Sequence, residues 1–297
     1  MTCPVPGLHR STPDGSTPRH DIALRVIAPR QPARYYRGVR RHRLIAFFLI
    51  TFALSWGIPG LLLLLSTLTD LFEVSLQRLS PLSCLFFWGP ALSAALMVGL
   101  TQGGRGLKSF ARRLVAVRFA WRWWLAVLVG APLLKLLAFG IAQDTDQSWT
   151  LFTTLPSDIL VSAAVLSALE VPVSEFGWRG FALPLLQRHV NGLVASIFLG
   201  ILWSVWYLPW LLPGTVMNWA PAGDSIPSIV RFFAGSIALS ITTTVLYNGA
   251  RGSMPLVILF LWISSLPRAW GLDTAISYID TVIALTTAVV LIFGVRR

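Results

Sequence analysis

Long runs of apolar residues alternate with short polar segments along most of this chain. A helix that crosses a bilayer needs about 20 consecutive apolar residues. By this measure the sequence predicts spans at residues 44–66, 81–100, 121–142, 157–176, 192–213, 228–248, 253–270 and 274–294. The predicted fold class is therefore all-α, a polytopic transmembrane helical bundle of about eight spans.

Composition supports a membrane protein. Hydrophobic residues make up 55% of the 297 residues and charged residues only 12%, whereas an average soluble domain is about 25% charged. The mean hydropathy is +0.69. These values exclude a soluble globular protein.

Residues 1–43 differ from the rest of the chain. They are rich in arginine and proline and contain few apolar runs, so they cannot bury a hydrophobic core. The sequence predicts a disordered cytoplasmic tail here and one membrane domain over residues 44–297. The segment does not resemble a cleavable signal, because the first apolar run begins only at Leu44 and further spans follow it. An alternative is that translation starts downstream of this low-complexity segment.

The net charge of +12 follows the predicted topology. With the N-terminus inside, 20 of the 24 Lys and Arg residues fall in inner segments, while acidic residues such as Asp70, Asp144 and Asp224 fall in outer loops. This is the positive-inside distribution. It predicts an integral membrane protein with both termini cytoplasmic and the lipid bilayer as its main partner, and it argues against a nucleic-acid partner.

The basic inner loop at residues 101–122 has its own pattern. Leu107, Phe110, Leu114 and Val117 recur at helical spacing, and the basic residues lie between them. A short amphipathic helix on anionic lipid headgroups is therefore expected.

Few ionisable residues lie within the apolar runs, and each is costly in a bilayer, so each is a functional candidate. Glu175 and Arg179 are four residues apart with the acid first, the favourable order for an intrahelical ion pair. Glu170 lies close by. Lys135 and Asp280 each stand alone in a span, where a side chain reaching toward the membrane surface is the simpler interpretation.

The sequence predicts neither a metal site nor a cofactor. Of the cysteines, Cys3 lies in the tail and Cys84 in a span, and His189 is the only one of four histidines outside residues 1–43. A zinc site needs more such ligands close together.

Four sequence elements together resemble one family. They are an upstream element, Trp88–Ala94, and three motifs numbered in chain order, the first at Ser174–Pro184, the second at Trp203–Pro209 and the third from Gly252 to Ser265. Their order and spacing resemble those of the CPBP intramembrane glutamate proteases, which include the type II CAAX prenyl proteases and bacteriocin-processing or self-immunity proteins. The resemblance implies the CPBP fold for the membrane domain, peptide-bond hydrolysis as the family's reaction, and a place in a bacterial plasma membrane.

The family's catalytic positions are substituted in this chain. By the resemblance, Ser174 replaces the glutamate that activates water, Tyr207 and Leu261 replace two histidines, and Ser265 replaces an asparagine. Serine is too weak a base, tyrosine is protonated at neutral pH, and leucine supplies no polar group. The sequence therefore predicts a catalytically degenerate member in which these four positions still surround one cavity, and which binds a membrane-associated or prenylated peptide or protein.

The retained motif residues Glu175 and Arg179 are expected to be structural. The alternative is an active endopeptidase with an altered site that uses Glu170 or Glu175 as base. Glu170 would project one turn from Ser174 on a continuous helix, but Pro172 between them predicts a kink. A small-solute transporter is a weaker third hypothesis, because the sequence shows no inverted repeat of broken helices.

Overall fold

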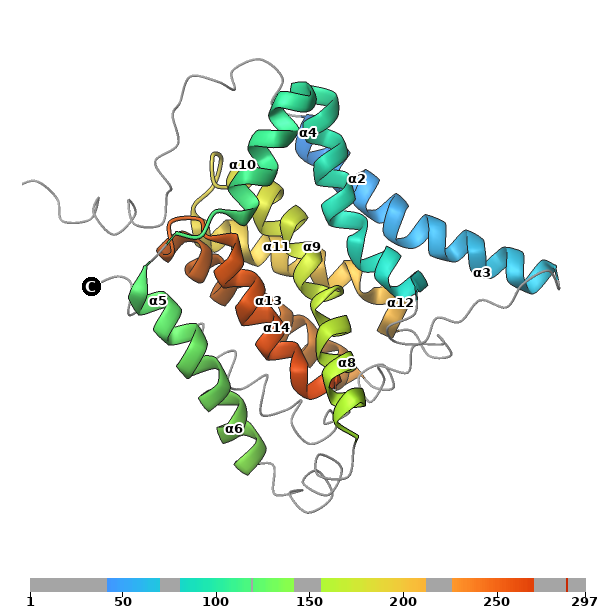
Figure 1. The fold of residues 1–297 in the computed structure, drawn as a ribbon. Helices are drawn as coiled ribbons and strands as arrows, with labels where there is room; N and C mark the ends of the chain where they lie inside the picture. Colours follow the sequence, from blue (N-terminus) through green and yellow to red (C-terminus); the bar gives the residue numbers. More distant parts are fainter. Residues whose placement is uncertain are drawn as a thin grey trace, which may run out of the picture.

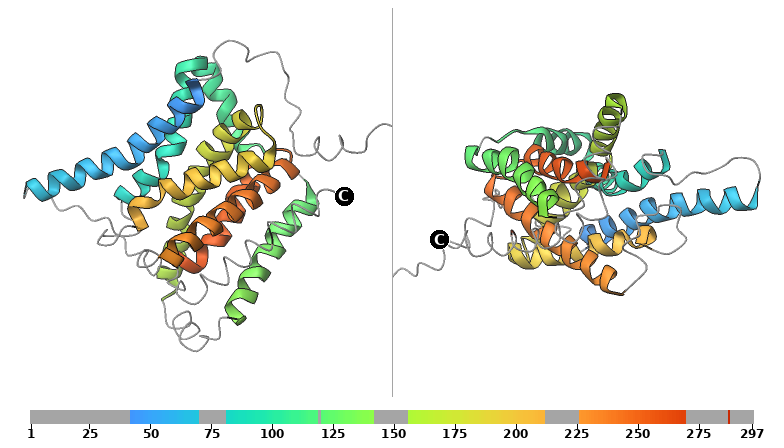
Figure 2. Two further views of the ribbon diagram at one scale, coloured as in Figure 1. Left: turned by 180° about the vertical axis from the view of Figure 1, so that it is seen from behind. Right: turned by 90° about the horizontal axis from the view of Figure 1, so that it is seen from below.

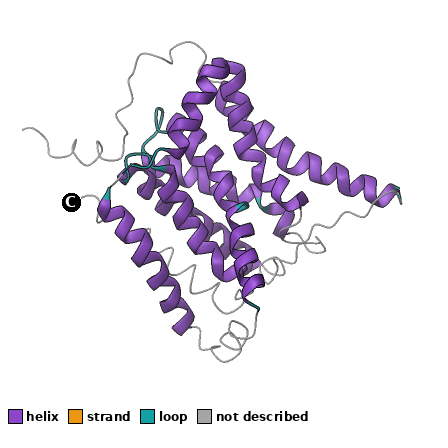
Figure 3. Ribbon diagram, in the orientation of Figure 1, coloured by secondary structure: helices purple, strands orange, loops and turns teal. Residues whose placement is uncertain are grey.

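The computed structural model describes residues 42–69, 81–118, 120–141, 156–211, 226–269 and Thr287. Helices and short connections make up this part of the chain, and no strand occurs in it (Figure 3). The α-helices are α2 (His42–Phe52), α3 (Ile58–Leu68), α4 (Pro81–Val115), α5 (Trp121–Leu125), α6 (Ala131–Ile141), α8 (Ser157–Ala168), α9 (Val171–Gly177), α10 (Leu183–Leu186), α11 (Gly192–Trp206), α12 (Leu208–Leu211), α13 (Ile226–Gly249) and α14 (Met254–Ala269).

The helices form a bundle in which α14 is central. It contacts α4, α6, α8, α9 and α13, while α11 packs along α13 and α9 along α4. The rod made by α2 and α3 and the rod made by α5 and α6 lie on opposite sides of the bundle (Figures 1 and 2). The first apolar segment contacts the bundle mainly through α2, which packs on α4.

Within the described residues, four helical segments are long and apolar enough to cross a membrane, Arg43–Leu68, Cys84–Val115, Ser157–Leu186 and Ile229–Gly249. Two shorter apolar helices, Gly192–Trp206 and Met254–Leu266, accompany them. Seven of the eight predicted spans thus fall on helical segments, with α5 and α6 covering the third. The eighth, 274–294, lies outside the described residues apart from Thr287, as do Asp280 and residues 1–41 of the predicted tail.

Large apolar side chains cover the outer surface of the bundle. Leu49, Leu64 and Leu68 on the first rod and Leu133 and Leu136 on α6 are each more than half exposed. So many exposed large apolar side chains are unfavourable in water. These side chains fit the hydrocarbon core of a bilayer, as the sequence predicted.

Three π-helical turns interrupt the apolar helices, and each precedes a proline. They are η1 (Ala53–Gly57), η2 (Ala126–Gly130) and η3 (Trp178–Ala182), and Pro59, Pro132 and Pro184 follow them. Proline lacks the N–H that would bond to the carbonyl four residues earlier, and its ring crowds that carbonyl. The wider turn relieves this conflict without ending the helix.

Pro90 within α4 has the same effect on a carbonyl of its own helix. It leaves the carbonyl of Phe86 without its usual helical donor. The Ser55 hydroxyl, on η1, donates to this carbonyl at 2.8 Å. Gly89 permits the approach, because a Cβ there would collide with the Ser55 hydroxyl.

The predicted amphipathic helix at residues 101–122 corresponds only in part to the end of α4, which changes direction at Gly103, where φ is +65°, and ends at Val115. Its apolar face is divided. Phe110 is buried in the core and Leu114 packs against that core, whereas Leu107 and Val117 are exposed. The expectation that this whole face lies on lipid is therefore wrong for Phe110 and Leu114, because the bundle itself offers them apolar partners.

Candidate functional site

The first motif lies on a helical segment with a break. Helix α8 ends at Ala168, α9 begins at Val171, and Glu170 between them has φ −95° and ψ −108°, which is not helical. Pro172 near the start of α9 explains the break, because it cannot donate to the last turn of α8. The predicted kink is confirmed, so Glu170 does not lie one turn before Ser174 on a continuous helix.

Two hydrogen bonds form at the break between α8 and α9. The Trp88 indole on α4 donates to the Leu169 carbonyl at 2.8 Å, and the Val173 N–H bonds to Glu170 rather than to Leu169. The carbonyl that the break leaves without a helical donor is thus satisfied from another helix. The Glu170 side chain is buried, at 4% exposure.

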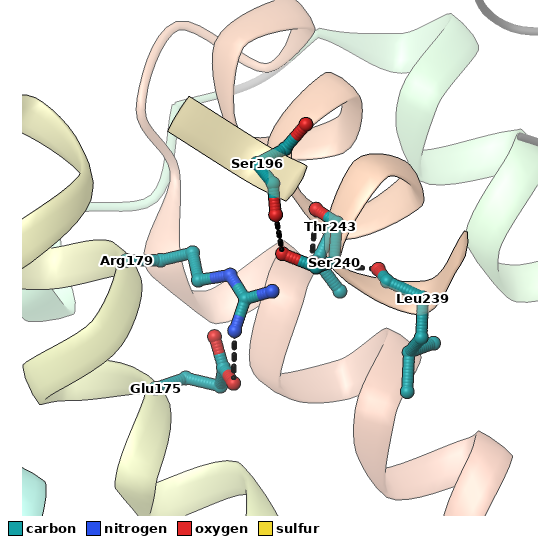
Figure 4. Close-up of polar contacts among 6 residues, drawn as sticks. All are labelled: Glu175, Arg179, Ser196, Leu239, Ser240 and Thr243. Carbon is teal, nitrogen blue, oxygen red and sulfur yellow. Dashed lines mark hydrogen bonds and ion pairs between the residues drawn. The ribbon is translucent and has the colours of Figure 1, made fainter. Parts of the chain in front are cut away.

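Glu175 and Arg179 form the predicted buried ion pair. Arg179 Nη1 donates to Glu175 Oε1 at 2.8 Å, and both side chains are almost fully buried (Figure 4). The helical segment continues to Leu186, so Arg179 lies inside the bundle and not in an inner loop beyond residue 176. A charge buried this deeply would be very unfavourable without a partner.

The glycines of the first motif permit close helix packing. A Cβ on Gly177 would collide with the backbone carbonyl of Pro90, and one on Gly180 would lie 2.7 Å from Leu114 Cδ2. Gly177 therefore brings α9 directly against the Gly89–Pro90 kink of α4. The Trp88–Ala94 element and the first motif are in contact through their backbones, which explains why small residues occur at both.

Tyr207 ends α11 and lies in an aromatic cluster. Its ring centroid is 4.9 Å from those of Trp203 and Trp206 and 5.9 Å from those of Phe87 and Phe232. The predicted span 192–213 is interrupted here, because Pro209 cannot donate an N–H within a continuous helix.

The third motif begins at a tight turn before α14. Gly252 has φ +81°, a conformation that favours glycine. Leu261, one turn beyond Val257, is buried at 3% exposure in the main core, and the Ser265 hydroxyl donates to the Trp262 carbonyl of its own helix at 2.8 Å.

The structure brings several of these positions toward one region. Tyr207 and Leu261 belong to the same buried cluster, and α9, which carries Ser174, packs on α14. Leu261 faces the interior and not lipid, as its assignment to the third motif requires. The convergence of all four substituted positions on one cavity remains a prediction.

A hydroxyl contact between α11 and α13, with further hydroxyl bonds beside it within α13, was not anticipated. Ser240 donates to the Ser196 carbonyl at 2.6 Å, and Thr243 donates to Leu239 and Ser240 (Figure 4). A Cβ on Gly200 would lie 2.7 Å from the Ile237 Cα. The signal in the sequence was the small and hydroxylated residues spaced along both helices, which are typical of close packing in membranes.

The described residues contain no group of three or more His, Cys, Asp or Glu side chains placed to hold a metal ion. Lys135 is half-buried in α6. Among the described residues, the buried charged side chains are those of Glu170, Glu175 and Arg179.

Two comparisons with known proteins gave matches. Residues 155–266 match the family model for type II CAAX prenyl endopeptidase Rce1-like proteins. A curated CAAX prenyl protease 2 of Methanococcus maripaludis is 28% identical over 134 residues, which are 44% of this chain and 49% of that protein. The chain thus spans about half the length of the curated relative it matches. The region that carries the Ser174–Pro184 motif is therefore similar to CAAX protease-like membrane proteins of the CPBP family.

Proposed function

We propose that this protein is a catalytically degenerate CPBP member that binds a membrane-associated or prenylated peptide or protein without cleaving it. The observation that carries the proposal is the identity of the residues at the motif positions, Ser174, Tyr207, Leu261 and Ser265. Hydrolysis needs a base to activate water and donors for the oxyanion. Leu261 offers neither, and it is packed in apolar core.

The surroundings of Glu175 support the same proposal. One carboxylate oxygen accepts from Arg179. This contact supports a structural role for Glu175, since proton transfer to Glu175 would leave Arg179 as an unpaired buried charge. A prenylated substrate class is proposed because the curated relative is named a CAAX prenyl protease.

A second candidate function is an active endopeptidase with an altered site. Glu170 favours it, because a buried carboxylate at a helix break four residues before Ser174 could supply a base. Against it stands the non-helical backbone of Glu170, which takes this residue out of the helical register of Ser174, whereas catalytic geometry tolerates shifts of only about 1 Å.

The test uses the purified full chain in proteoliposomes with a farnesylated C-terminal peptide. Saturable binding by fluorescence anisotropy, with no cleavage product by mass spectrometry, is expected, and the same peptide without the prenyl group is the control. Cleavage that is lost in Glu170→Gln or in Glu175→Gln would establish the enzyme instead. Absence of peptide binding would contradict the proposed ligand.

A gain-of-function variant tests the assignment of positions. Ser174→Glu, Tyr207→His, Leu261→His and Ser265→Asn together are expected to introduce cleavage, whereas each single change is not, because catalytic groups act as a unit. Cleavage by a single variant would contradict the proposed degenerate site.

A further inference from the structure

Three arginines from distant parts of the sequence line one pocket. Arg43 comes from the start of α2, Arg113 from the last part of α4, and Arg188 follows α10. Polar Gln102 and Ser109 also line it, and Phe181 and Pro184 supply apolar walls. The pocket is open to ligands from outside, since Arg188 and Ser109 are exposed.

The charged side chains that line this pocket are all positive, as far as the structure describes it. The described lining includes three guanidinium groups and no carboxylate. Guanidinium groups from separate helical segments that lie around one pocket favour an anion there. The Nε of Arg43 is moreover buried without a hydrogen-bond partner among the described residues.

Arg113 is held in place by the first motif. Its Nη2 donates to the Gly180 carbonyl at 3.2 Å, and its guanidinium lies 5.3 Å from the centroid of the Phe110 ring. Gly180 is four residues before Pro184, so its carbonyl lacks the usual helical donor. A guanidinium has five N–H donors, and this bond uses one.

We propose that this pocket binds a phosphate group, carried by an anionic lipid headgroup or by free phosphate. Guanidinium groups match phosphate oxygens in geometry and charge, and basic pockets between transmembrane helices bind anionic headgroups. The start of α2 and the kinked end of α4 lie together at one end of the bundle, and the start of α8 lies at the other (Figure 1). An end of the bundle is where a headgroup would be found.

Phosphate binding here would act directly on the first motif. The ligand would contact Arg113, which bonds to the carbonyl of Gly180, the residue after Arg179. Occupancy would therefore stabilise η3, the turn that carries half of the Glu175–Arg179 pair. This effect does not depend on whether the protein cleaves or only binds a peptide.

The test is isothermal titration calorimetry of the purified full chain in non-ionic detergent. The ligands are dihexanoyl phosphatidic acid, inorganic phosphate, and dihexanoylglycerol, which lacks the phosphate. Phosphatidic acid should bind, and Arg43→Gln and Arg188→Gln should each weaken binding about fivefold to tenfold, as expected for losing a charged hydrogen bond. Arg112→Gln, which removes an exposed charge beside Arg113 but outside the pocket lining, should change binding less than about twofold.

The ligands distinguish the source of the phosphate. Tighter binding of phosphatidic acid than of inorganic phosphate identifies a headgroup site, and equal binding identifies a free-phosphate site. The proposal is overturned if neither phosphate ligand binds, if dihexanoylglycerol binds equally well, or if Arg112→Gln weakens binding as much as the pocket variants. Circular dichroism and gel filtration of each variant exclude misfolding as the cause of a loss.

Discussion

Single side chains replace backbone hydrogen bonds that proline and the helix break remove. Ser55 donates to Phe86, Trp88 donates to Leu169, and Arg113 donates to Gly180. Each acceptor belongs to a different interruption, and each donor comes from a distant part of the sequence. In hydrocarbon no water is present to bond to the freed carbonyls, so these side-chain donors remove the energetic cost of interrupting a helix.

We expect Ser55→Ala to lower the free energy of unfolding by about 1 kcal/mol, because it leaves the buried Phe86 carbonyl without a donor. Denaturant titration in mixed micelles measures this. Ser93→Ala is the matched control, since the buried Ser93 hydroxyl bonds only to Gly89 of its own helix. Equal losses of stability in the two variants would mean that the Ser55 bond between helices contributes no more than a hydroxyl bond within one helix.

Glu175→Gln should destabilise the protein by about 3 kcal/mol, because Arg179 would keep a buried charge without its counterion. The same titration is the measurement. The double variant Glu175→Leu with Arg179→Met should recover most of the loss, since it leaves no charge unpaired. A single variant as stable as the wild type would show that the pair is not needed for the fold.

At the scale of the helices, close packing depends on a few glycines. Gly177 brings α9 against α4, and Gly200 brings α11 against α13. Because lipid is as apolar as the side chains, helix association in a membrane relies on such packing. The same contact sets the position of the Glu175–Arg179 pair relative to the Pro90 kink.

Gly177→Ala is expected to cost about 1–3 kcal/mol, the usual effect of overpacking a tight contact. Its Cβ would collide with the Pro90 carbonyl, a backbone atom that cannot rotate away. Gly99→Ala in α4, where a Cβ would meet nothing within 4 Å, should be neutral or slightly stabilising. Thermal unfolding of both variants in detergent tests the difference, and similar losses would rule out the proposed contact.

At the scale of the whole molecule, exposed charges lie at different ends of the bundle. Arg105 and Lys108 are exposed near the kink of α4, and Asp158 is exposed at the start of α8. We propose that the basic end faces the cytoplasm, by the positive-inside rule.

Cysteine labelling tests this orientation. In a Cys3→Ser, Cys84→Ala background, Asp158→Cys should react with a membrane-impermeant maleimide in intact cells, and Arg105→Cys should react only after permeabilisation. The labelled fraction is read by gel shift. Reaction of both positions from the same side would contradict the proposed topology.

The helical membrane fold and the pairing of Glu175 with Arg179 could be determined from the sequence alone. Both are local properties: a span depends on a continuous apolar run, and the pair depends on a spacing of four residues within one helix. The register of the third motif likewise agreed with the buried position of Leu261.

The tertiary structure alone decided which distant side chains satisfy the helix breaks. It placed the Trp88 indole on the Leu169 carbonyl, assigned Phe110 to the core instead of to lipid, and gathered Arg43, Arg113 and Arg188 around one pocket. These features depend on contacts between residues that are far apart in the chain. Hydropathy and spacing describe only neighbours along a helix. They cannot reveal which distant side chain will donate to a freed carbonyl, or which distant charges will line the same pocket.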